Sequence, residues 1–209
     1  MTQSSYDNSP YNRSSPQESP HESSPYHDPA TLPDGWPVVS RVHLVAFGIC
    51  AVLFWLVILM SRMQFVWAID HVNVAIHETG HLLFRPLGFT MHMWGGTLFQ
   101  LLMPLVIGVY FWRKRQAAGV AVMGLWLGKS LLHVAVYVAD AKAMVLPLVG
   151  GNVHDWRFIL GRFGCVDNCT TIAAVIQVVA WLLMFAAAGW YVWRWWVSVE
   201  YARQRAHSQ

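Results

Sequence analysis

The chain has 209 residues, of which 56% are hydrophobic and only 12% are charged. A soluble domain would carry about twice that charged fraction, so the composition indicates an integral membrane protein. The net charge of +3 divides unevenly, because residues 1–40 hold five acidic side chains and a single basic one, Arg13. The other basic residues are scattered at the ends of apolar segments, without the basic and aromatic patch typical of nucleic-acid binding. We therefore expect an all-α polytopic protein that contacts the lipid bilayer and binds no nucleic acid.

The first 40 residues are rich in Ser and Pro and carry almost no aliphatic side chains. Such a segment cannot bury enough apolar surface to fold, so we expect a disordered tail over residues 1–40. The first apolar stretch begins only near Val42, which argues against a signal peptide.

Five apolar segments follow the tail, and we expect each to form a transmembrane helix. They cover residues 42–60, 63–84, 98–112, 117–139 and 170–193. Together they predict a helical membrane domain over residues 41–196, followed by a short C-terminal tail at 197–209.

Two of the connections carry features of their own. The stretch Arg85-Pro86-Leu87-Gly88 ends the second segment, because proline and glycine interrupt a helix. We expect residues 89–96 to form a turn or a short re-entrant piece. The long connection at 140–169 is expected to contain a short helix over 157–163.

Basic residues near the ends of the spans predict the orientation, because they mark the cytoplasmic side. The run Arg113-Lys114-Arg115 and the arginines after the fifth segment agree if five segments cross. This count puts the acidic tail on the outer side. It also puts the connection at 140–169 on the same side as the second half of the second segment.

That second segment contains the pattern HExxH, formed by His77, Glu78 and His81. Residues four apart lie on one face of a helix, so both imidazoles can bind one metal ion. Zinc-dependent hydrolysis requires such ligands, an open coordination position and a carboxylate that takes a proton from metal-bound water. An idle charge near the bilayer centre would cost about 2.5–3.5 kcal/mol, which disfavours a chance occurrence of the motif. We predict one zinc ion here, with Glu78 as the catalytic base.

The residues alone leave the remaining ligands open. His154 and Asp155 lie in the connection that emerges on the side of the motif. His133 lies at a similar depth on the fourth segment, but such a histidine can also simply hydrogen-bond a neighbour. Asp70 shares a helix face with the motif histidines, and it either lines the site or forms a buried pair with Lys129.

Cys165 and Cys169 flank three residues of the same connection. A CxxxC pair can form a disulfide outside the cytosol, bind a metal as thiolates, or remain as two free thiols. The sequence does not choose between these states.

The HETGH helix, the later stretch GGTLFQLLMPL and a distant HDW together resemble the site-2 protease type of intramembrane zinc metallopeptidase. The resemblance covers about residues 68–164. It implies that His77 and His81 bind zinc, that Glu78 is the base, and that Asp155 is the third ligand. The family usually has Asn-Pro-Asp-Gly around that aspartate. This chain has Asn-Val-His-Asp, so His154 remains an alternative ligand.

The favoured hypothesis is a multi-pass zinc metalloendopeptidase of the cell membrane. It would cut a membrane protein or peptide within or beside the bilayer. A second hypothesis is a non-catalytic metal-binding scaffold, whose function would survive replacement of Glu78 by Gln. A third is a transporter that uses the intramembrane charges Asp70 and Lys129. Transporters are often built from internal repeats, and this sequence has none.

Overall fold

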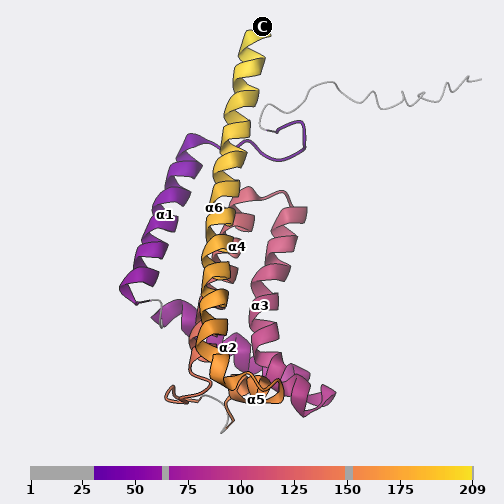
Figure 1. Ribbon diagram of the computed structural model, residues 1–209. Helices are drawn as coiled ribbons and strands as arrows, with labels where there is room; N and C mark the ends of the chain where they lie inside the picture. Colours follow the sequence, from indigo (N-terminus) through magenta and orange to yellow (C-terminus); the bar gives the residue numbers. More distant parts are fainter. Residues whose placement is uncertain (1–30, 63–65, 149–152, 209) are drawn as a thin grey trace, which may run out of the picture.

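In the computed structural model, residues 31–62, 66–148 and 153–208 are described, and they form six α-helices and two short 3-10 helices. Judged by length and composition, four of the helices can cross a membrane. They are α1 (Arg41–Met60), α3 (Phe89–Arg113), α4 (Ala117–Ala139) and α6 (Cys169–His207). In Figure 1 these four run along the length of the molecule, whereas α2 (Trp67–Phe84) and α5 (Asp155–Arg162) cross its lower end.

The motif helix α2 is the segment that we expected as the second of five spans, and it is not among the four. Its polar residues explain the difference. Asp70, Asn73 and His77 are buried in the protein, and each lowers the mean hydropathy of a helix that is only 18 residues long. The described residues therefore contain four helices that meet the length and composition of a membrane span, and α2 packs mainly against α3 at one end of them.

Residues 89–96 belong to α3, so the expected turn or re-entrant piece is wrong. The break is confined to η1 (Arg85–Leu87) and to Gly88, whose φ of +97° suits a glycine. Two other glycines, Gly80 and Gly95, allow close helix packing and do not form turns. A Cβ on Gly80 of α2 would overlap the carbonyl oxygen of Gly95 on α3, so these two helices approach closely only because both positions lack a side chain.

The polar side of α2 is matched by polar groups on α4. Lys129 Nζ lies 2.5 and 2.6 Å from the two carboxylate oxygens of Asp70, and both side chains are fully buried. The side-chain oxygen Oδ1 of Asn73 accepts hydrogen bonds from the Trp126 indole and the Ser130 hydroxyl, each at 3.1 Å. Asp70 and Lys129 thus form the buried pair that was one of the two predicted alternatives.

The end of the predicted tail is packed against the protein. Within residues 31–39, here called the N-terminal segment, Leu32, Trp36 and Val39 are buried. The Trp36 ring packs edge-on against Trp112 and Trp190, with ring centroids 5.2 and 5.5 Å away. Residues 1–30 of the predicted tail lie outside the described part of the chain.

Charge pairing places the N-terminal segment at the end that carries Arg113-Lys114-Arg115. The Arg194 guanidinium donates to Asp34 Oδ2 over 2.6 Å, and the Val39 amide donates to the Ser198 hydroxyl over 3.0 Å. The five-span count put the acidic tail on the side opposite to these basic residues, and for residues 31–39 that expectation is wrong. The reason is that α2 does not reverse the direction of the chain across the bundle.

The short helix α5 starts at Asp155, two residues before the predicted 157. His154 is its N-cap, since the His154 Nδ1 accepts a hydrogen bond from the Arg157 amide. Trp156, Ile159 and Leu160 are buried in a cluster with residues of α3, α4 and α6. This apolar side fixes α5 against the lower end of the bundle and so positions Asp155.

Candidate metal centre

Three side chains converge where α2 meets the start of α5. His77 and His81 project from the same face of α2, four residues apart. Asp155 Oδ2 lies 3.0 Å from His77 Nε2 and 3.1 Å from His81 Nε2. All three side chains are at most 12% exposed. One carboxylate oxygen therefore faces the same ring nitrogen of both motif histidines.

The hydrogen bonds on the other ring nitrogens determine the tautomers. His81 Nδ1 lies 2.6 Å from the backbone carbonyl oxygen of His92, which can only accept, so His81 Nδ1 carries a proton. His77 Nδ1 lies 3.2 Å from Gln100 Oε1. The amide of Gln100 is held in that orientation because its Nε2 donates to the Ser130 carbonyl oxygen. His77 Nδ1 is therefore a donor as well.

Both Nε2 atoms consequently point a lone pair at the Asp155 carboxylate unless they take up a second proton. Two lone pairs and an anionic oxygen repel one another without a cation between them. Two imidazoles and one carboxylate are also a known ligand set of catalytic zinc, and each imidazole has the outer hydrogen bond typical of a metal-bound histidine. The donor set present thus fits a divalent metal ion such as zinc.

The ionisation of these groups reflects the same convergence. Burial alone would raise the pKa of Asp155, but the hydrogen bonds with His77 and His81 outweigh it and hold the pKa below its ordinary value. Burial alone would lower the pKa of His81, yet the Asp155 carboxylate raises that pKa above its ordinary value. Positive charge on the His81 imidazole is therefore favoured beside the Asp155 carboxylate.

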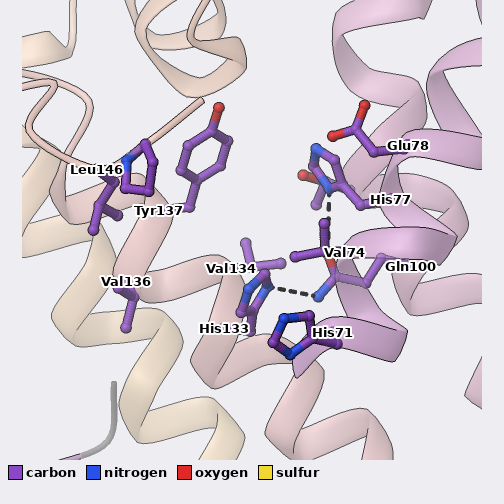
Figure 2. Close-up of a pocket in the computed structure, with 12 residues that line it drawn as sticks. His71, Val74, His77, Glu78, Gln100, His133, Val134, Val136, Tyr137 and Leu146 are labelled. Atoms are coloured by element: carbon purple, nitrogen blue, oxygen red, sulfur yellow. Dashed lines mark hydrogen bonds between the residues drawn. The ribbon is translucent and has the colours of Figure 1, made fainter. Parts of the chain in front are cut away.

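Glu78 completes the motif beside the donors. Ligand atoms of Glu78, His77 and His81 all lie within 4.8 Å of one another, which is a spacing that could hold a metal ion. Glu78 is half-buried and borders a cleft of about 480 Å³ that is formed by α2, α3, α4 and residues 146–147. Figure 2 shows Tyr137 and Leu146 on the side of this cleft opposite His77 and Glu78.

A glycine of α3 makes room for the first ligand histidine. A Cβ on Gly96 would overlap the imidazole ring of His77 at Nε2, Cε1 and Cδ2. The GGT stretch is therefore a packing requirement of the site, because any side chain at Gly96 would displace the His77 ring.

The other candidate residues lie elsewhere. His154 Nε2 is 3.4 Å from Asp140 Oδ2, and the His154 ring stacks on Tyr137 with centroids 4.1 Å apart. Burial lowers the pKa of His154, which favours the neutral ring. His133 is linked to the donor His77 through Gln100, with His133 Nδ1 3.2 Å from the Gln100 amide nitrogen (Figure 2). The residue that faces both motif histidines is Asp155 rather than His154 or His133. Asp70 forms its ion pair with Lys129.

Gln100 and Tyr137 are site residues that the sequence analysis missed. Gln100 orients His77, and the signal for it was a polar side chain inside an apolar helix. Tyr137 borders the cleft with its ring centroid 6.1 Å from that of His77, and no motif marks it. Cys165 and Cys169 are both free thiols, so the disulfide that was one of their possible states is not formed.

A comparison of the chain with protein families, curated proteins and solved structures finds no match. The class of protein is thus defined by the molecule itself. Over the residues that the structure describes, the protein is all-α, with four helices long and apolar enough to cross a membrane and a His-Glu-His group that could hold a metal ion.

Proposed function

We propose that this protein is a membrane-embedded zinc endopeptidase. One observation carries the proposal: the Nε2 atoms of both HExxH histidines converge on one oxygen of Asp155, beside Glu78 and an open cleft. The resemblance to site-2 proteases supports it, because that family uses the same three ligand types. The substrate would be a peptide segment of a membrane protein at the end of the bundle where α2 and α5 lie.

Each residue then has a defined task. His77, His81 and Asp155 would hold the ion, with Gln100 and the His92 carbonyl fixing the two rings. When bound, zinc supplies Lewis-acid chemistry, since it polarises a peptide carbonyl and lowers the pKa of water. The Glu78 carboxylate would accept a proton from the attacking water and pass it to the nitrogen of the leaving amine.

Burial of the donors is compatible with this chemistry. The cleft beside Glu78 gives water and a peptide access to the site, while the apolar residues around it keep the local dielectric low.

By the distribution of basic residues, the end with Arg113-Lys114-Arg115 would face the cytoplasm and the metal site would lie toward the opposite face.

The experiment compares zinc content and cleavage of a reporter membrane substrate in the wild type, Glu78→Gln and Glu200→Gln. Glu200 is a matched control because it lies on α6, far from the motif in sequence, and pairs with Arg203 on the same helix. We expect about one zinc per chain in all three proteins, and loss of cleavage by at least about 10²-fold in Glu78→Gln alone. A functional protein that tolerates Glu78→Gln would instead be the non-catalytic metal-binding scaffold. Wild type without zinc would refute both.

A further inference from the structure

A row of side chains along α2 connects two different hollows. His71, Val74 and His77 border the cleft of about 480 Å³, and His81 and Arg85 border a second hollow of about 660 Å³. Glu78 borders both. The spacing of three and four residues puts this row on one side of the helix. The proposed catalytic carboxylate therefore lies at the junction of the two hollows.

The first hollow is apolar away from the metal donors. Its wall opposite α2 contains one histidine, His133, and is otherwise formed by Val134, Val136, Tyr137, Leu146 and Pro147. These side chains offer contact area to aliphatic or aromatic groups and no charge. Figure 2 shows Tyr137 and Leu146 of this wall across the cleft from His77 and Glu78 of α2.

The second hollow is basic at the end that lies seven residues of helix beyond Glu78. Arg85 lies at the end of α2, and no carboxylate of the described residues is within ion-pair distance of it. His81 and His92 border the same hollow. The N-terminus of α3, which has no side-chain cap, begins here at Phe89, and its helix dipole favours negative charge. Arg162 of α5 donates to the Thr90 hydroxyl over 3.1 Å and so adds a second guanidinium beside this helix end.

The walls of the basic hollow are held by packing. Phe89 meets Phe158 of α5 edge-on, with ring centroids 5.0 Å apart. His92 Nδ1 lies 2.9 Å from the His81 carbonyl oxygen, and His81 Nδ1 donates back to the His92 carbonyl. The start of α3 is thus tied to α5 on one side and to α2 on the other.

The length of the row matches a short extended peptide. Fourteen residues of helix separate His71 from Arg85, which is about 21 Å at 1.5 Å per residue. An extended chain rises about 3.3 Å per residue, so about six residues fit along the row. A chain laid there would pass Glu78 near its middle, with one half against the apolar wall and the other half beside Arg85.

We propose that this site selects peptides with apolar residues on one side of the scissile bond and a carboxylate on the other, bound by Arg85. The inference rests on the proposed peptidase function and adds a substrate class to it. The carboxylate is either an Asp or Glu side chain or the C-terminus of the peptide. An anionic group beside Arg85 gains a charge-assisted hydrogen bond, while a lysine there would be repelled.

The test measures binding of fluorescent peptides to zinc-loaded, full-length Glu78→Gln protein, which binds without cleaving. The peptides share an apolar half and carry Asp, Asn or Lys at successive positions of the other half, each with a free or an amidated C-terminus. We expect the best Asp peptide to bind about tenfold more tightly than its Asn counterpart at low salt. This ratio should fall toward one at 1 M salt, where the screening length shrinks to about 3 Å.

Variants at Arg85 identify the group responsible. In the same background, Arg85→Met should abolish the Asp preference and Arg85→Glu should reverse it in favour of Lys. Arg113→Met, at the far end of α3, is the matched control and should leave the preference unchanged. A preference that disappears on amidation assigns the C-terminal carboxylate, whereas one that persists assigns the side chain.

The outcomes separate the two proposals. Equal binding of Asp and Asn peptides, or an Asp preference that survives Arg85→Met, overturns the substrate inference. Cleavage of both peptides at equal rates by the wild type also overturns it and leaves the peptidase standing. Selective binding of Asp peptides without any cleavage by zinc-loaded wild type supports the basic hollow and overturns the peptidase.

Discussion

Replacement of Lys129 by Met should strongly destabilise the fold, because it leaves a buried carboxylate without its countercharge. Asp70 and Lys129 are both fully buried, and Lys129 Nζ contacts both oxygens of the carboxylate. The carboxylate also accepts from the Val66 amide at 2.6 Å and from the Asn73 amide at 3.2 Å, and these bonds remain in the variant. Breaking one side of a buried pair costs about 3–5 kcal/mol. The two remaining donors place our expectation at the lower end, about 3 kcal/mol.

The assay is the free energy of unfolding in mixed micelles, followed by the helical circular dichroism signal. Asp70→Asn combined with Lys129→Met removes both charges and keeps an acceptor for the Val66 amide, so it should recover more than half of the loss. The reasoning is refuted if Lys129→Met unfolds within about 1 kcal/mol of the wild type, or if the double variant is as unstable as the single one.

Three further predictions concern the metal site and the N-terminal segment. Asp155→Ala should lose zinc in metal analysis, whereas His154→Ala should keep most of it; the reverse result would move the third ligand by one residue. Gly96→Ala should weaken zinc affinity by at least about 10-fold, because its methyl group displaces the first motif histidine. Gly189→Ala, where a methyl group meets no neighbour, is the control, and equal affinities would contradict the packing argument. The hydrogen bond from Arg194 lowers the pKa of Asp34. The stabilising contribution of the Asp34 carboxylate is therefore present above about pH 4 and is lost as the pH falls through the lowered pKa. The Asp34 side chain is about half exposed, which limits this contribution to about 1 kcal/mol. Oxidative footprinting should show the N-terminal segment loosening only on acidification.

The parts of the site that the sequence predicted are those with local or chemical signals. The HExxH spacing needs only a helix, and the pairing of Asp70 with Lys129 follows from the cost of burying either charge alone. The convergence of Asp155 on the motif histidines was an expectation from family resemblance, and the structure brings these residues together. Its role as a ligand remains a prediction.

The features that were missed depend on contacts between distant segments. The N-terminal segment reads as part of a polar tail, and the arginine that forms an ion pair with Asp34 lies 160 residues later, at Arg194. The position of α2 at the end of the bundle was misjudged, because apolar length alone does not distinguish a span from a helix that lies across other helices. The turn expected at residues 89–96 failed because paired glycines also permit close helix packing.

The matching of polar groups between α2 and α4 has a consequence for the motion of the site. A slip of α2 by one helical turn, about 5.4 Å, would separate Asp70 from Lys129 and Asn73 from Ser130 at once. Apolar surfaces tolerate such a slip, because one aliphatic contact replaces another, whereas buried charges find no second partner. The alignment of α2 is therefore all-or-none. His77 and His81 should keep their places up to the point at which the whole bundle opens, so metal release and global unfolding should coincide on heating.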